Sequence, residues 1–203
     1  MRLNCRDVRR TRSVRACVVV ALLLAPVALA PAAVAAPPAT QQAALGRKIV
    51  AYCKGQLDKP VGDGECAALA EHALRECGAK GQGDDHPNKG DYAWGELVLV
   101  VNGGAPVSFE SGKPADVRAG DVIQFRDAQF EGRKGRGTYT QSAPHHTAVV
   151  AEKDATGITL KIFDQNSNGQ RVVKEGQIRL NDLKSGWLRF YRPIPTNEPK
   201  SRE

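Results

Sequence analysis

Residues 62–78, GDGECAALAEHALRECG, join a glycine-rich turn to an amphipathic segment. Apolar and small side chains recur there at helical spacing along one stripe, which comprises Cys66, Leu69, Ala70, Ala73, Leu74 and Cys77. The pattern predicts a helix over 65–78 that ends at Gly78. Because the first member of the stripe is a cysteine, the segment raises the question of whether Cys66 packs in a core or reacts.

The position of Cys66 suits a reactive thiol. The first turn of a helix carries unpaired backbone N–H groups and the positive end of the helix dipole, and both stabilise an anion. A thiolate there has a lowered pKa, and the N–H groups of Glu65 and Cys66 would form an oxyanion hole. Asp63 or Gly64 would cap the helix. The alternative is a small core residue, and this stretch alone leaves both interpretations open.

The first 35 residues have the composition of a secretory signal peptide. Six arginines and one acidic residue, Asp7, precede an unbroken apolar or small run over 16–36 that contains Ala33-Val34-Ala35. A basic head, an apolar middle and a small-x-small end predict cleavage after Ala35 and export. The run is long enough for an uncleaved anchor, but Pro26 and Pro31 argue against one. We therefore expect a secreted or periplasmic protein with no stable membrane insertion after cleavage.

The basic character of the chain comes mostly from this leader. The full sequence has 29 Lys and Arg against 22 Asp and Glu, and without the leader 23 basic and 21 acidic residues remain. A chain near +2 gives no reason to expect nucleic-acid binding. The remaining 168 residues can bury a core of their own.

Three cysteines, Cys53, Cys66 and Cys77, follow the leader, so at least one thiol is unpaired within a monomer. In an antiparallel pair of helices, Cys53 and Cys77 would be offset by about 12 Å at ~1.5 Å per residue. A disulfide needs Cα atoms within about 7 Å. We therefore expect no Cys53–Cys77 bridge unless the helices cross steeply.

The rest of the chain changes from helical to extended periodicity. A first helix is expected over 41–57, and YAWGELVLVV (92–101) fits a short helix or a strand. The segment 126–139 would be a flap or a solvated hairpin. Strands are expected over 122–125, 146–153, 158–164, 171–180 and 187–194. Short connections between them predict an antiparallel order.

Together these features predict an α+β fold, with N-terminal helices packed on a five- to six-stranded antiparallel sheet. The expected organisation is a signal peptide over 1–35, a linker over 36–41, a single domain over 42–194 and a disordered tail over 195–203.

A thiolate nucleophile needs an imidazole and a group that orients it. His72 falls on the polar side of its helix and His86 in a charged loop, so both are expected to be solvated. His145 and His146 begin a strand, one on each face, and alternation alone does not say which face meets the helices. Asp164 and Asn166 share a face at the end of the next strand, although a polar run there is also typical of a plain turn.

The order of these pieces resembles the CHAP group of papain-like amidohydrolases and peptidases, relatives of the NlpC-type cell-wall peptidases. The resemblance covers residues 45–192, and its motifs are GDGEC with Cys66, AGDVIQF with Gly120 and Asp121, HTAVV with His146, and DQN with Asp164 and Asn166. It implies a papain-like, CHAP-like half-barrel. Two departures are Ala67, where an aromatic residue is usual, and Asp164, where a longer Glu is frequent.

The resemblance implies a role for each candidate residue. Cys66 would attack a carbonyl carbon, and His146 would accept the thiol proton and return it to the leaving amine. Asp164 or Asn166 would fix the imidazole tautomer. Two aromatic residues, Tyr92 and Trp94, would wall a substrate groove, with structural packing as the alternative.

The sequence thus predicts an exported thiol hydrolase that cleaves amide or peptide bonds, with cell-wall peptide as the substrate class implied by the family. The alternatives are a non-catalytic binding module on the same fold and an acyltransferase that delivers the acyl group to an amine or lipid. We expect a monomer without a cofactor. We also expect no metal, because no histidine or cysteine pair has the short spacing of a structural zinc site.

Overall fold

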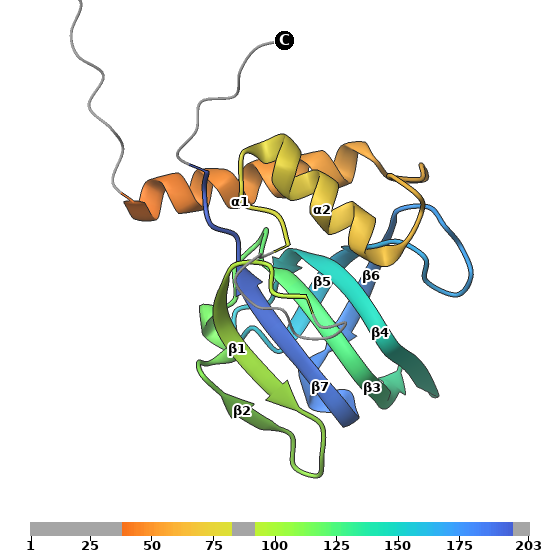
Figure 1. The fold of residues 1–203 in the computed structure, drawn as a ribbon. Helices are drawn as coiled ribbons and strands as arrows, with labels where there is room; N and C mark the ends of the chain where they lie inside the picture. The colour runs from red at the N-terminus through yellow and green to blue at the C-terminus, as the bar shows by residue number, and fades with distance from the viewer. Residues whose placement is uncertain (1–37, 83–91, 197–203) are drawn as a thin grey trace, which may run out of the picture. The chain divides into compact units, whose positions relative to one another are not determined.

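The computed structural model describes residues 38–82 and 92–196. The predicted signal peptide, the first residues of the predicted linker, His86 and the tail beyond 196 lie outside the described residues. Within the described part, two N-terminal helices pack on one antiparallel sheet (Figure 1), so the α+β prediction is confirmed.

The helices are α1 (Pro38–Gly55) and α2 (Cys66–Cys77). Helix α1 begins inside the predicted linker, because residues 38–41 are helical. Helix α2 ends as expected, since Gly78 adopts a left-handed φ of 77° and its N–H bonds to the carbonyls of Leu74 and Arg75. Thr196, which falls in the predicted tail, is bonded to the end of α2, because its N–H donates to Gly78 O at 2.9 Å.

The sheet has seven strands in the order β2-β1-β7-β3-β4-β5-β6, and every neighbouring pair is antiparallel. The strands are β1 (Glu96–Asn102), β2 (Ser108–Glu110), β3 (Val122–Lys134), β4 (Gly137–Lys153), β5 (Thr159–Asp164), β6 (Lys174–Arg179) and β7 (Leu183–Arg192). Two short 3-10 helices, η1 (Pro114–Asp116) and η2 (Leu180–Asp182), lie between strands.

The sheet has one strand more than the upper end of the predicted five to six. Residues 92–101 contribute the strand β1 rather than a helix, and the short strand β2 was not predicted. The segment 126–139 is the outer half of a long β3–β4 hairpin, which pairs as far as Lys134 and Gly137. Of its two predicted forms, the hairpin is the one observed.

Two hydrophobic clusters lie on opposite faces of the sheet. One joins α1 and α2 to the sheet through Val122, Val149 and Phe163. The other, on the face turned away from the helices, includes Phe125 and Ala148. Alternation along β4 therefore puts Val149 beneath the helices and places His146 on the same face as Ala148.

The glycine of the AGD motif is explained by a close backbone approach. Gly120 has a φ of 89°, and a Cβ built on it would lie 2.5 Å from the Cα of Gly46 in α1. Only a residue without a side chain fits there, so Gly120 lets α1 pack directly on the turn that leads into β3.

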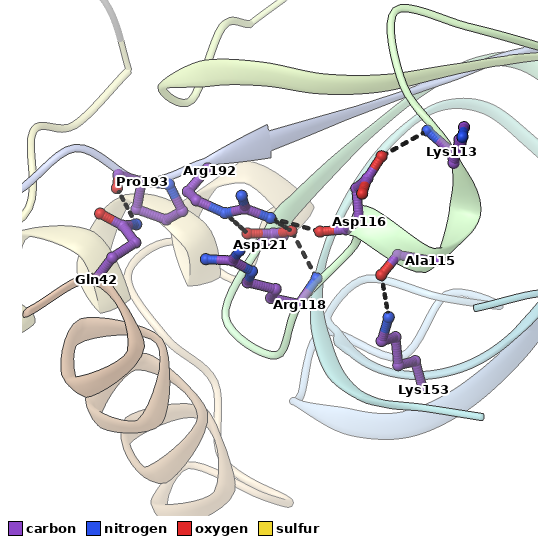
Figure 2. Close-up of polar contacts among 9 residues, drawn as sticks. All are labelled: Gln42, Lys113, Ala115, Asp116, Arg118, Asp121, Lys153, Arg192 and Pro193. Atoms are coloured by element: carbon purple, nitrogen blue, oxygen red, sulfur yellow. Dashed lines mark hydrogen bonds and ion pairs between the residues drawn. The ribbon is translucent and has the colours of Figure 1, made fainter. Parts of the chain in front are cut away.

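The aspartate of the same motif forms a buried ion pair, shown in Figure 2. Arg192, the last residue of β7, donates from Nε and Nη2 to the Asp121 carboxylate at 3.2 and 3.0 Å, and from Nη2 to Asp116 O at 2.7 Å. The N–H of Arg118 also donates to Asp121, at 2.8 Å. The pair ties the end of β7 to the turn before β3.

Within the described residues, Cys53, Cys66 and Cys77 form no disulfide bond. Burial is the main reason that the pKa of Cys53 rises to about 12, so this thiol is unreactive at neutral pH. Neither α1 nor α2 combines the length and the apolar character that a membrane span requires.

Candidate active site

The turn before α2 delivers Cys66 to the first position of that helix. Gly62 and Gly64 adopt φ values of 59° and 84°, which suit glycine. Glu65 is the N-cap residue, and its side chain makes no capping bond. Asp63, one of the two predicted caps, does not cap the first turn of the helix. Its Oδ1 accepts the N–H of the N-cap residue Glu65 at 2.9 Å. Cys66 is partly exposed at the helix end.

The imidazole predicted to serve Cys66 lies on β4 and is oriented by β5. His146 Nε2 is 2.9 Å from Asp164 Oδ2, and both side chains are largely buried. The register that pairs Ala148 with Asp164 brings the two residues together. The ring of Phe125 meets the His146 ring edge to face at 5.6 Å and limits its rotation. Asp164 therefore orients the ring despite being shorter than Glu.

Cys66 and His146 act on each other's pKa through hydrogen bonding and charge. Since Nε2 of His146 faces Asp164, Nδ1 is the ring nitrogen left for the thiol. Burial is the largest single influence and raises the pKa of Cys66. The hydrogen bond and charge of His146, together with the N–H groups of Thr147 and Ala67, outweigh burial, so the pKa lies below its usual value.

Burial also acts on His146, where it lowers the pKa. The hydrogen bonds and charges of Asp164 and Cys66 outweigh burial and raise the pKa of His146 to about 9. A lowered thiol pKa beside a raised imidazole pKa favours a thiolate–imidazolium pair at neutral pH. This is the state that a cysteine nucleophile needs.

We expect the His146 ring to keep its second proton up to a pH of about 9, whereas an ordinary histidine loses it near 6.5. The charged form is therefore present below about pH 9 and is lost above it. Nitrogen-15 NMR of the imidazole, followed against pH, measures the midpoint. Asp164→Asn should move the midpoint down, because the carboxylate charge is gone. A native midpoint near 6.5 would contradict the geometry described here.

Asn166, the alternative orienting residue, does not contact the ring. Its Nδ2 donates instead to Glu65 Oε2 at 2.8 Å, so it holds the turn before Cys66. A residue that the sequence did not suggest, Ser167, lies beside Asp164 and the His146 ring instead. Ser167 donates its hydroxyl to Asp164 Oδ2 and lies 3.4 Å from His146 Nε2. Its place in a polar turn, NSNG (166–169), gave no sign of this contact.

Most of the amino-acid sequence matches a known family. Residues 38–201 match the family described as the AIM3/BBC1 cysteine proteinase-fold domain. The chain belongs to this family. The match supports a papain-like fold for the domain that carries Cys66, His146 and Asp164. It does not assign the domain to the CHAP group.

Two curated relatives share this AIM3/BBC1 domain sequence over part of their length. Altered inheritance of mitochondria protein 3 of Debaryomyces hansenii is 33% identical over 153 residues, which is 74% of this chain and 16% of that protein. SH3 domain-containing protein C23A1.17 of Schizosaccharomyces pombe is 28% identical over 81 residues, which is 38% of this chain and 5% of that protein. The chain thus spans a small part of both relatives.

Two solved structures also align with the AIM3/BBC1 domain. The crystal structure of Ly7917 aligns with a TM-score of 0.44 at 17% identity, over 72% of this chain and 62% of that one. The crystal structure of Ly7917 with the hydrolyzing product of MDP aligns with a TM-score of 0.41 at 15% identity, over 73% and 62%.

The two predicted groove residues have different surroundings. Trp94 is fully buried beneath the helices, and its Nε1 donates to Gln124 Oε1 at 3.3 Å, so packing rather than substrate contact explains it. Tyr92 is partly buried and its ring lies 5.7 Å from that of His145. His145 is exposed on β4.

Gln124 was not predicted and supports the strand that carries His146. This buried side chain donates from Nε2 to His146 O at 3.1 Å and accepts the hydroxyl of Thr147 at 3.1 Å. It also accepts the Trp94 N–H. The sequence does not reveal this supporting role of Gln124, because its partners lie on a neighbouring strand and in a distant loop.

The predicted oxyanion hole is only half formed. The N–H of Glu65 is bound to Asp63, so it does not face a substrate in this conformation. Cys66 N–H remains as the donor from the predicted pair. The Glu65 carboxylate is occupied by Asn166 and, at 2.5 Å, by Arg171 Nη2. Within 38–82 and 92–196, no three His, Cys, Asp or Glu side chains gather as a metal site would require.

Proposed function

We propose that this domain is a thiol hydrolase that cleaves amide bonds through a covalent thioester on Cys66. The observation that carries the proposal is that His146, 2.9 Å from Asp164, is also the side chain that lowers the pKa of Cys66. These three residues lie on α2, β4 and β5, and the site depends on all three elements. Membership in a cysteine proteinase-fold family supports the same reading.

The geometry supports a two-step reaction. The Cys66 thiolate attacks the carbonyl carbon, the C–N bond breaks, and the imidazolium of His146 gives its proton to the leaving amine. Water then attacks the thioester while His146 accepts a proton from it, which breaks the C–S bond, releases the acid and restores the thiolate–imidazolium pair. Asp164 holds the ring throughout and favours its charged form. The Cys66 N–H is placed to stabilise the oxyanion.

The substrate class that we propose is a peptide or peptide-like amide, with the peptide part of cell-wall material as one candidate. The proposal of export rests on the basic and apolar composition of the first 35 residues. A monomer is sufficient, because Cys66, His146 and Asp164 all come from one chain.

Intact-mass spectrometry after mixing with an activated acyl ester tests the covalent step. One acyl group should appear on Cys66 of the native protein and be lost with time. Cys66→Ala should acquire none, whereas Cys77→Ala is the matched control and should behave as native. Added amine distinguishes hydrolysis from acyl transfer, because an acyltransferase would yield an amide product. Acylation of Cys77 in place of Cys66 would overturn the proposal.

A binding module without turnover is the second candidate function. The bound Glu65 N–H favours it, because an oxyanion hole with fewer donors stabilises a transition state less well. In that case the domain would bind the same peptide with comparable affinity in native and Cys66→Ala forms, and neither protein would release product. Calorimetry together with product analysis separates the two functions.

A further inference from the structure

Gln165 stands between the residue that orients His146 and the residue that holds Glu65. It directly follows Asp164, the last residue of β5, and it precedes Asn166. Its side chain is fully buried, at 0% exposure, although it is a polar residue in a polar stretch. A buried amide needs partners for all its donors and its acceptor, so its contacts indicate its role.

All the contacts of this amide go to the turn before Cys66. Gln165 Oε1 accepts the N–H of Val61 at 2.7 Å, and Nε2 donates to Val61 O at 3.0 Å. Nε2 also donates to Glu65 O at 2.8 Å. One side chain thus binds both ends of the 61–65 turn, and its second end is the residue before the nucleophile.

This turn needs an external support. Gly62 and Gly64 both have positive φ, and glycines give a free chain many alternative backbone conformations. The helix that follows has no side-chain cap of its own. Val61 is buried, so it cannot exchange the Gln165 bonds for water. Gln165 therefore selects one conformation of the turn.

We propose that Gln165 is a positioning residue that fixes the 61–65 turn and so presents the sulfur of Cys66 to His146. The proposal deepens the function proposed above and rests on it. Asp164 and Gln165 are consecutive, and one holds the base while the other holds the nucleophile. The end of β5 thereby sets the distance between the two halves of the site.

The Gln165→Met variant tests this, because methionine has a similar length and no hydrogen bond to offer. The readout is the rate of Cys66 alkylation by iodoacetamide against pH, which needs no substrate. Its midpoint should rise by about one pH unit, with about a tenfold slower rate at neutral pH, because the contact with His146 is loosened. Gln165→Asn keeps the amide on a shorter stem and should shift the midpoint by less.

Tyr139→Phe is the matched control, since it removes one hydrogen bond, 2.8 Å to Asp182, in the outer half of the β3–β4 hairpin. It should leave the midpoint unchanged. A purely structural Gln165 would lower the urea midpoint of unfolding without moving the alkylation midpoint of the folded protein, and that result in Gln165→Met would overturn the inference. If the shift occurs and the native protein turns over no substrate, the positioning role stands and the hydrolase proposal fails.

Discussion

The His146→Ala variant is expected to lose amide hydrolysis by about 10²–10⁴-fold, the range typical of a lost general acid–base. Without the imidazole, the Cys66 thiol loses its hydrogen-bonded partner and the charge that lowers its pKa, and the leaving amine loses its proton donor. Initial rates on the peptide amide that acylates the native protein measure the loss. Cys66→Ala should remove the reaction altogether, because the nucleophile is gone.

The control for this experiment is the neighbouring histidine. His145 lies on the same strand but is exposed and stacks near Tyr92 rather than Cys66. His145→Ala should therefore retain the native rate within a few-fold. The double variant Cys66→Ala/His146→Ala should be no slower than Cys66→Ala alone, since the residues act as one unit. A large loss in His145→Ala with an active His146→Ala would mean that the wrong histidine has been assigned.

Replacing Arg192 with leucine is expected to have the largest effect on stability, a loss of about 3–5 kcal/mol in the free energy of unfolding. Asp121 is only 2% exposed, and the Arg192 side chain is 16% exposed, so the variant leaves a carboxylate buried without its cation. Burial has the largest effect on the pKa of Asp121, and it raises this pKa even with Arg192 present. Urea denaturation followed by tryptophan fluorescence measures the change.

Two comparisons isolate the buried charge as the cause. Lys174→Ala breaks an exposed ion pair with Asp58, 2.7 Å long, and should cost only about 0–1 kcal/mol. Asp121→Asn/Arg192→Leu should recover part of the loss, because no buried charge remains. The loss in Arg192→Leu should also shrink as the pH falls, since the unpaired carboxyl then takes up a proton. Equal losses in Lys174→Ala and Arg192→Leu would contradict this explanation.

Local sequence patterns identified the elements of this fold because each has a clear period or a required turn residue. Helix α2 follows from its apolar stripe and from Gly78, whose left-handed φ ends it. The meander from β3 to β6 follows from alternation and short polar turns. Strand β2 has three residues and no fully buried side chain, so it lacks a periodic signal.

The site could be anticipated only in part. The order of Cys66, His146 and Asp164 located the reacting groups, but the choice between Asp164 and Asn166 depends on strand register and backbone twist. Asn166 has a positive φ of 60°, which turns its side chain toward Glu65 instead of the ring. The burial of Trp94 and the contacts of Gln165 likewise depend on which loop packs above the sheet, and sequence spacing does not contain that information.

The central claim is that the Cys66 sulfur exists as a thiolate because His146 lies against it. The ultraviolet absorbance of thiolates, measured against pH as the difference between the native protein and Cys66→Ala, tests this claim without any substrate. The account predicts a midpoint below the ordinary thiol value of about 8.5, and a higher midpoint in His146→Ala. A native midpoint at or above that value, unchanged by His146→Ala, would contradict it.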